Sequence, residues 1–205
     1  MTQFFVIHPE SPQPRLIKQA VKILQDGGVI VYPTDSIYAI GCKLENKKAL
    51  DHIRRIRQLD DKHHFTLVCR DLSELSTYAI VDNTAFRFIK AHIPGPYTFI
   101  LKGSKELPRR LMHPKRNTVG LRVPDNKIVQ ALLEELNEPI MSVTLILPEE
   151  DNRLVDAHDI YEKLNSEVEL VIDGGPCGVE PTTMIDLTEE TLKIMRVGRG
   201  DVSSL

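Results

Sequence analysis

The strongest constraint on the fold of this chain is its alternation of short β-type segments with amphipathic segments in no strict order. The β-type segments are rich in Val, Ile, Leu, Phe or Thr and are bounded by Gly, Pro or Asp, which is typical of strands. Helices are predicted where apolar residues recur every three to four positions. The predicted strands are Phe4–Ile7, Val29–Tyr32, Phe65–Cys69, Tyr97–Lys102, Thr118–Val123, Ile140–Leu147, Val168–Asp173, Thr183–Leu187 and Leu192–Val197. The predicted helices are Pro14–Asp26, Asn46–Leu59, Thr84–Ile93, Asp125–Leu136 and Ala157–Leu164.

This pattern predicts the α/β (α+β) class, with a twisted mixed sheet of parallel and antiparallel strands and flanking helices. A length of 205 residues suffices for one buried core, and no repeat or linker divides the sequence, so we expect a single domain over residues 1–205. Cys42, Cys69 and Cys177 lie far apart and are expected to be reduced thiols. No apolar run reaches the roughly 20 residues of a membrane helix, and the N-terminus does not resemble a signal peptide. We therefore expect a cytoplasmic protein.

Charge is segregated along the sequence. Residues 102–122 contain seven Lys or Arg and one acid, whereas residues 134–190 contain sixteen acids and two basic residues. Such segregation could serve a phosphate-bearing ligand, either a nucleotide or RNA, but from charge alone two solvated faces of opposite charge are the favoured interpretation. For RNA, the predicted contacts are Arg109, Arg110, Lys115 and Arg116.

The segment Pro33–Gly41, with the sequence PTDSIYAIG, directly follows a predicted apolar strand. Ligand sites in α/β proteins often lie beyond strand ends. Thr34 and Ser36 supply hydroxyls that can donate and accept hydrogen bonds, as recognition of a small polar substrate requires. The alternative is an ordinary capped turn.

Arginines form a second candidate group, at the end of the helix predicted over 46–59. Arg55 and Arg57 can both turn toward one ligand if the helix end frays, and their guanidinium groups match phosphate oxygens in a bidentate way. The alternative is a solvated basic helix end.

Two predicted strands place polar side chains at alternate positions. Thr118 and Arg122 share one face of the strand TVGLRVP, with Gly120 between them leaving room for a ligand. Arg122 requires a partner in such an apolar strand, and either a structural or a substrate carboxylate would serve. The other hydroxyls are on Ser142 and Thr144, with the alternative of a polar outer face; Thr182, Thr183 and Arg196 follow later in the chain.

Two other signals carry no prediction of chemistry. The P-loop pattern is absent, so a nucleotide would have to be held differently. His63 and His64 have no second cluster at metal-ligand spacing and are predicted to lie in a loop. No metal site built by the protein is predicted.

Taken together and in this order, the segments resemble the YrdC/YciO family, and most closely its YciO-like branch. The resemblance runs from about Leu16 to Arg199. Each short motif is weak alone, but their collinear order is specific. The matching segments are PTDSIYAIG, Arg55–Arg57 at the Lys-x-Arg motif, PGPYTFIL, TVGLRVP, Pro139–Thr144 leading into the Ser-x-Asn motif, Pro181–Thr183, and Arg196–Gly198.

The resemblance implies a synthase that condenses L-threonine, bicarbonate and ATP into threonylcarbamoyl-adenylate and pyrophosphate, for threonylcarbamoyladenosine modification of tRNA. It implies a concave basic cavity in a YrdC-like fold, sometimes associated with double-stranded RNA. Magnesium would arrive with ATP. By this resemblance Arg55 and Arg57 are the catalytic pair; Thr34, Arg122, Ser142 and Thr182 hold threonine; and Arg55, Arg57, Thr118, Thr144 and Arg196 surround the nucleotide.

The sequence also departs from the family pattern, mainly on the nucleotide side. Arg55 replaces the motif lysine, Gln58 a proline, Ala39 a glycine, and Cys69 a histidine. Ile146 stands where the family has the asparagine of Ser-x-Asn, and its side chain has no hydrogen-bonding group. Two functions therefore remain open: an enzyme that makes this adenylate or a close relative of it, and a non-catalytic protein of the same fold that binds double-stranded RNA or nucleotides.

Overall fold

The computed structural model describes residues 1–60, 63, 65–148 and 154–203. The strands are β1 (Gln3–Val6), β2 (Ile30–Tyr32), β3 (Ala39–Lys43), β4 (Thr66–Val68), β5 (Ala79–Ile80), β6 (Tyr97–Gly103), β7 (Thr118–Arg122), β8 (Ile140–Thr144), β9 (Leu170–Asp173), β10 (Thr183–Asp186) and β11 (Lys193–Arg196). The helices are α1 (Pro14–Gln25), α2 (Lys47–Arg57), α3 (Leu72–Tyr78), α4 (Asn83–His92), α5 (Lys127–Leu136) and α6 (Ala157–Leu164), with a short 3₁₀ helix at Arg109–Leu111.

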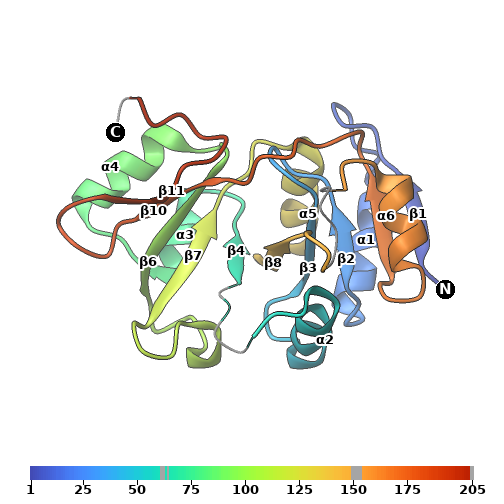
Figure 1. Cartoon of the computed structure of the whole chain (residues 1–205), viewed down its shortest axis with the longest axis horizontal. Coiled ribbons are helices and arrows are strands. Elements are labelled where there is room, and N and C mark those ends of the chain that lie inside the picture. Colours follow the sequence, from blue (N-terminus) through green and yellow to red (C-terminus); the bar gives the residue numbers. More distant parts are fainter. Residues whose placement is uncertain (61–62, 64, 149–153, 204–205) are drawn as a thin grey trace.

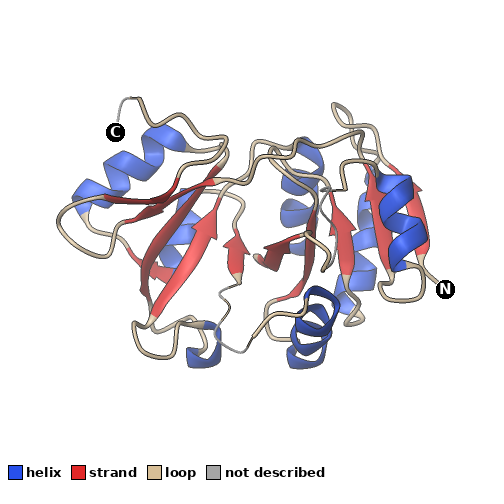
Figure 2. Cartoon of the chain, in the orientation of Figure 1, coloured by secondary structure: helices blue, strands red, loops and turns tan. Residues whose placement is uncertain are grey.

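All of these strands belong to one mixed sheet, which runs across the molecule (Figures 1 and 2). Its order is β1-β9-β2-β3-β8-β4-β7-β6-β10-β11, and β5 pairs with β6. Parallel pairs join β1 to β9, β9 to β2, β4 to β7 and β6 to β10. The central strands β2, β3, β8 and β4 pair antiparallel in succession. The predicted mixed α/β fold is confirmed.

Helices cover both faces of the sheet. On one face α1 and α5 pack against each other and bury Ile30, Tyr32 and Ile140. The alternate strand residues, such as Val31, point to the other face and share a core with the apolar sides of α2, α3, α4 and α6. The two cores follow from the period-two alternation of strands that are buried on both sides.

The sequence-based segmentation holds for the long elements and fails for several short ones. Each of the five predicted helices is present, with ends that shift by a few residues. Strands β3 and β5 and helix α3 are not among the predicted elements, and the strand predicted over residues 140–147 ends at Thr144. The first of these misses matters for function, because β3 lies between β2 and β8 in the middle of the sheet.

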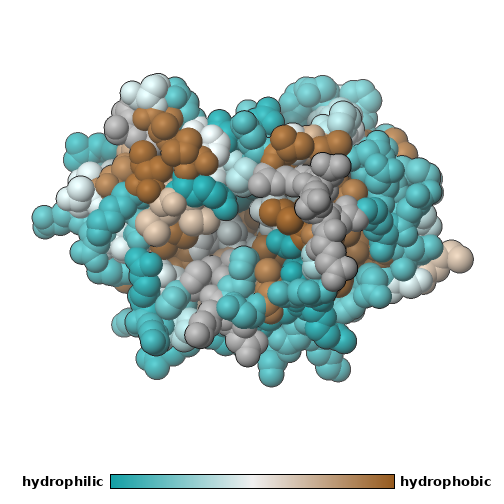
Figure 3. All heavy atoms as spheres, viewed as in Figure 1, coloured by the Kyte–Doolittle hydropathy of each residue, from teal (hydrophilic) through white to brown (hydrophobic). Residues whose placement is uncertain are grey.

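Strand β11 forms one edge of the sheet. All four of its residues are exposed, and Ile194 and Met195 keep 40% and 54% of their surface accessible. Figure 3 shows hydrophobic residues gathered over this part of the molecule. Among the described residues, no helix is long and apolar enough to cross a membrane.

Candidate functional site

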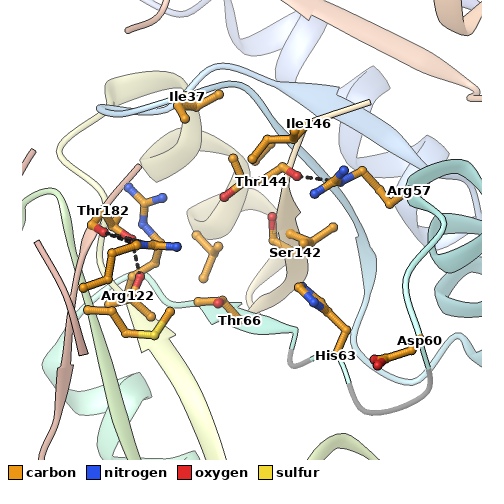
Figure 4. A pocket seen from close by; sticks show the side chains of 16 residues that line it. Ile37, Arg57, Asp60, His63, Thr66, Arg122, Ser142, Thr144, Ile146 and Thr182 are labelled. Atoms are coloured by element: carbon orange, nitrogen blue, oxygen red, sulfur yellow. Dashed lines mark hydrogen bonds between the residues drawn. The ribbon is translucent and has the colours of Figure 1, made fainter. Parts of the chain in front are cut away.

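A cavity of about 420 Å³ lies on the face of the sheet that also carries α1 and α5. Most of its strand residues come from alternate positions, which is why their side chains share that face. Figure 4 shows these side chains pointing inward from both sides. The polar lining residues are Arg57, Asp60, His63, Thr66, Thr98, Arg122, Ser142, Thr144, Thr182 and Arg196.

A row of small residues lies across four neighbouring strands beneath the cavity. Gly41 of β3 pairs with Ser142 of β8, Ser142 with Thr66 of β4, and Thr66 with Gly120 of β7. A Cβ atom at Gly120 would lie 3.2 Å from Thr66 Oγ1 and 3.4 Å from Thr98 Cγ2. The side chains of Thr66 and Thr98 thus occupy the space beside Gly120, and a larger residue at this position would crowd the floor of the cavity.

Arg122 enters the cavity from the end of β7 and is almost completely buried, with 7% of its surface exposed. One terminal nitrogen forms an ion pair with Asp35, and the other donates to Ser36 Oγ at 3.4 Å. Asp35 in turn accepts a hydrogen bond from the backbone N–H of Asp125 at 2.9 Å. Arg122 Nε is buried and has no hydrogen-bond partner. Of the two partners that the sequence left open, the structural carboxylate is present, and one donor remains unused.

Thr182 lies beside Arg122 (Figure 4), and Arg196 of β11 lines the same cavity and contacts Thr182. Arg196 Nε and Nη2 donate to the Thr182 carbonyl at 3.1 and 2.9 Å, and Nη2 also donates to Thr182 Oγ1 at 3.2 Å. The Thr182 hydroxyl lies 2.7 Å from that of Thr98. These contacts hold two hydroxyls and a guanidinium at one end of the cavity.

Arg57 is the last residue of α2 and approaches from the opposite side (Figure 4). Its Nε donates to the Thr144 carbonyl at 2.8 Å, which leaves the terminal nitrogens of the fork toward the cavity. Burial lowers the pKa of Arg57 to about 10, so the group remains protonated at neutral pH. The cavity thus has cationic groups at both ends.

Two further polar residues come from the connection between α2 and β4. The backbone N–H of His63 donates to the Asp60 carbonyl at 3.1 Å, and both residues line the cavity. The pKa of His63 is lowered mainly by its partial burial and, to a smaller extent, by the positive charge of Arg57. No role is predicted for Asp60 or His63 from the sequence, because the match to the family pattern is loose over Asp60–His64. His64 lies outside the described residues.

The structure does not bring three of the predicted site residues to the cavity. Arg55 is exposed, and its Nη2 lies 3.4 Å from His52 Nδ1, because residues two apart on a helix point in different directions. Thr118 lies at the far end of β7, opposite Lys102. Thr34 uses its hydroxyl to hold a turn, donating to the Ile37 carbonyl at 2.7 Å and accepting from Ser36 N–H at 3.1 Å. The other predicted residues, Arg57, Arg122, Ser142, Thr144, Thr182 and Arg196, all line the cavity.

Apolar side chains complete the lining. Ile146 is half-buried near Arg57 and Thr144, and Ile37 lies nearby (Figure 4). Val68, Ala39 and Met184 contribute further apolar surface. A cavity with an apolar wall and a few fixed polar groups is suited to a small organic ligand that carries charges at defined positions.

The four basic residues predicted for RNA lie outside this cavity, in the connection between β6 and β7. Arg109, Arg110, Lys115 and Arg116 are all exposed. Arg110 Nη2 donates to the Glu45 carbonyl at 3.2 Å, and Arg116 Nη2 forms a 2.8 Å ion pair with Asp186. The group is therefore a solvent-facing basic loop, with part of its charge offset by Asp186.

Comparison with known proteins gives matches over almost the whole chain. The model of the Sua5/YciO/YrdC family, described as "Telomere recombination", matches residues 22–198. The uncharacterized protein YciO of Escherichia coli (strain K12) is 59% identical over 202 residues, which is 98% of each chain. The threonylcarbamoyl-AMP synthase of Vibrio vulnificus (strain YJ016) is 27% identical over 161 residues, covering 77% of this chain and 86% of the relative.

Solved structures show the same fold. The crystal structure of E. coli YciO superposes with a TM-score of 0.95 at 59% identity, covering 99% of this chain and 98% of YciO. The crystal structure of P. abyssi Sua5 complexed with L-threonine has a TM-score of 0.87 at 24% identity. The superposition covers 96% of this chain but 58% of the Sua5 chain, so this chain corresponds to part of that longer protein.

Proposed function

The chain belongs to the Sua5/YciO/YrdC family, and from this membership and its cavity we propose that it is a threonylcarbamoyl-AMP synthase-like enzyme. The proposed reaction joins L-threonine, bicarbonate and ATP into threonylcarbamoyl-adenylate and releases pyrophosphate. The product would serve threonylcarbamoyladenosine modification of tRNA. The observation that carries the proposal is the convergence of Arg57, Arg122 and Arg196 on one cavity lined by hydroxyls.

The threonine site of the proposal is the end of the cavity around Arg122. Its buried Nε lacks a partner, and an unsatisfied buried donor is costly, so a ligand carboxylate there would gain a charge-assisted hydrogen bond. Ser142 and Thr182 lie in the same cavity, and their hydroxyls suit a small polar amino acid. The Sua5 protein of P. abyssi has been crystallised with L-threonine, which supports threonine as the ligand.

The nucleotide side of the proposal is the end around Arg57. Guanidinium forks bind phosphate oxygens, and the charge of Arg57 persists at neutral pH. Mg²⁺ would enter with the ATP phosphates, because Mg²⁺ is usually held by one or two carboxylates together with substrate phosphates, and Asp60 is the carboxylate among the described residues of this cavity lining. Ile146 provides an apolar contact where the family motif has the amide of an asparagine. We therefore expect a lower affinity for the nucleotide than in a protein with that asparagine.

The chemistry requires positioning more than a covalent intermediate. Bicarbonate takes up a proton and loses water to give CO₂, and the neutral threonine amine adds to CO₂ and releases a proton, which gives a carbamate. A carbamate oxygen then forms a bond to the α-phosphorus as the bond from that phosphorus to the pyrophosphate oxygen breaks and pyrophosphate leaves. Arg122 would hold the carboxylate, and Arg57 would offset the charge that develops on the phosphates. Arg196, fixed by Thr182, would add a second cation near the transferring group.

Calorimetric titration with L-threonine tests this placement. Removing Arg122 alone would leave Asp35 buried and unpaired, so the informative variant is the double substitution Asp35→Asn and Arg122→Leu. We expect threonine affinity to fall at least about tenfold in this variant, as for loss of one charged hydrogen bond. The control is Glu10→Gln with Lys127→Leu, which alters an exposed ion pair and should bind threonine normally. Unchanged affinity in the Asp35/Arg122 variant would contradict the proposed carboxylate site.

RNA binding by the exposed basic loop is the second candidate function. Arg109 and Lys115 face solvent on a loop that does not line the cavity. RNA binding by this loop would therefore not depend on a reaction in the cavity. Binding to double-stranded RNA should then weaken steeply with salt, with the slope falling by about one for each phosphate contact removed. Replacing Arg109, Arg110, Lys115 and Arg116 by Gln should abolish the salt-dependent part. RNA affinity that survives this change would rule out the loop as the binding surface.

A further inference from the structure

The side chain of Tyr32 reaches from β2 across the neighbouring strand to the cavity residue Ser142. Tyr32 is completely buried, and its hydroxyl lies 2.7 Å from Ser142 Oγ on β8. Strand β3 lies between β2 and β8, and its residue opposite Ser142 is Gly41. A Cβ atom at Gly41 would lie 3.2 Å from Tyr32 Cε1 and 2.9 Å from the Met141 carbonyl oxygen. The glycine therefore gives the phenol ring room to pass over β3.

The hydrogen bonds of Ser142 can be counted. A serine hydroxyl has one hydrogen to donate and two lone pairs that accept. Ser142 Oγ donates its hydrogen to the Ile40 carbonyl at 3.3 Å, and one lone pair accepts from Tyr32. A carbonyl oxygen can only accept a hydrogen bond, so the series of hydrogen bonds runs from Tyr32 through Ser142 to Ile40. One lone pair of Ser142 remains for the cavity that it lines.

From this count we propose that Tyr32 is a positioning residue. Its hydrogen bond holds Ser142 Oγ, whose own hydrogen is bound to the Ile40 carbonyl, so that the remaining lone pair accepts from an N–H or O–H donor of the ligand. The inference rests on the proposed function and deepens it. A carboxylate or phosphate oxygen is an acceptor and cannot bond to Ser142 in this state. The amino acid therefore lies with its carboxylate toward Arg122 and a donor, either the amino group or the side-chain hydroxyl, toward Ser142.

The amino group is compatible with this arrangement throughout the reaction. An ammonium, an amine and the carbamate formed from it each keep at least one N–H. Burial raises the pKa of Tyr32 to about 12, so the phenol keeps its own donating hydrogen across the working pH range. The acceptor character of Ser142 is thus constant while the nitrogen changes its chemical state.

The test is a double-mutant cycle with Tyr32→Phe, Ser142→Ala and the combined variant, with threonine Kd measured by calorimetry. We expect Ser142→Ala to raise the Kd about tenfold and Tyr32→Phe to raise it about threefold, within the usual range for one hydrogen bond. The combined variant should match Ser142→Ala alone, because Tyr32 acts through Ser142. ATP affinity should not change. Effects that multiply in the combined variant, or a normal Kd in Tyr32→Phe, would overturn the proposal.

A matched control separates positioning from stability. Tyr38 is also completely buried, and its hydroxyl donates to the Gly175 carbonyl at 2.7 Å rather than to a cavity residue. Tyr38→Phe should lower the urea midpoint about as much as Tyr32→Phe while leaving the threonine Kd unchanged. A parallel rise of the Kd in both variants would show a general loss of packing and would contradict a specific role of Tyr32.

A second ligand identifies the donor. L-2-Aminobutyrate has the amino group of threonine but lacks its hydroxyl. If the amino group bonds to Ser142, Ser142→Ala weakens both ligands by the same factor; if the hydroxyl does, it weakens threonine alone. Both results support the acceptor role, and no effect on either ligand overturns it. Failure of the wild-type protein to bind either amino acid would instead remove the proposed function itself, and the inference with it.

Discussion

The buried ion pair of Arg122 and Asp35 links stability to the candidate site at the scale of single residues. Arg122 keeps 7% of its surface exposed, and its charge is balanced by a carboxylate that is itself held by a backbone N–H. The ion pair offsets most of the free-energy cost of burying the guanidinium, but Arg122 Nε still has no hydrogen-bond partner. A ligand that satisfies this nitrogen would stabilise the folded protein as well as bind to it.

Substitution of Arg122 by Ala should therefore destabilise the protein strongly. Asp35 would be left buried without its partner, a change that typically costs about 3–5 kcal/mol. Urea unfolding followed by circular dichroism measures the effect. Lys127→Ala removes an exposed ion pair with Glu10 and should move the midpoint little. Equal midpoints for the two variants would show that the Asp35 contact is not a buried pair in solution.

Ile146 is the residue that departs most from the family pattern within the cavity. Ile146→Asn would place an amide beside Arg57 and Thr144, where it can donate to or accept from a nucleotide. One neutral hydrogen bond contributes about 0.5–1.5 kcal/mol, so ATP should bind about twofold to tenfold more tightly. Calorimetry with ATP-Mg measures this, and Ile146→Val serves as the control for a change in size. Unchanged or weaker ATP binding in Ile146→Asn would place the nucleotide elsewhere.

At the scale of elements, the strands position the site because their registers align. The small residues Gly41, Ser142, Thr66 and Gly120 come from four strands that are distant in sequence. Helix α5 covers the adjoining part of the same face and buries Leu132 and Leu133 against α1 and the sheet. No residue of α5 is among the described residues that line the cavity, which lies on the neighbouring part of this face.

The cap of α5 should contribute measurably to stability. Asn126 Oδ1 accepts a hydrogen bond from Val129 N–H at 3.1 Å, which satisfies one free donor of the first turn. Asn126→Ala should cost about 1 kcal/mol of unfolding free energy, whereas Asn126→Asp keeps an acceptor and should be close to neutral. Thermal or urea unfolding of both variants checks this. A cost as large for Asp as for Ala would argue against the capping role.

Sequence patterns predicted the helices well and the short strands poorly, for physical reasons. The helix over residues 14–25 has a strong apolar stripe and two terminal glycines after it, so local sequence identifies it. Strand β3, with the sequence AIGCK, contains a glycine and follows a polar turn, so it carries no clear strand pattern. Its place is set by pairing with β2 and β8, which is information that only the folded sheet supplies.

The same limit applies to the site. Strand alternation and the family resemblance together pointed to Arg57, Arg122, Ser142, Thr144, Thr182 and Arg196, which converge on the cavity. They could not reveal that the Thr34 hydroxyl holds a turn. They also gave no sign of Asp60 or His63, since the position of a loop relative to a sheet depends on tertiary packing.

At the scale of the whole molecule, one mixed sheet carries a cavity on one face and a basic loop outside that cavity. The fold is shared with E. coli YciO and, at lower identity, with P. abyssi Sua5, whose chain is longer. The cavity suits a small organic ligand, and the basic loop faces solvent outside it. We propose that this cavity makes threonylcarbamoyl-adenylate from threonine, bicarbonate and ATP.

The most direct test is pyrophosphate release from ATP-Mg and bicarbonate, with and without L-threonine. The wild-type protein should release pyrophosphate only with threonine, and Arg57→Ala should lower the rate about a hundredfold, as for loss of one well-placed charged donor. Arg55→Ala, which alters an exposed neighbour on the same helix, should keep the wild-type rate. Pyrophosphate release that does not depend on threonine, or no release by a folded protein that binds both substrates, would contradict the proposed synthase activity.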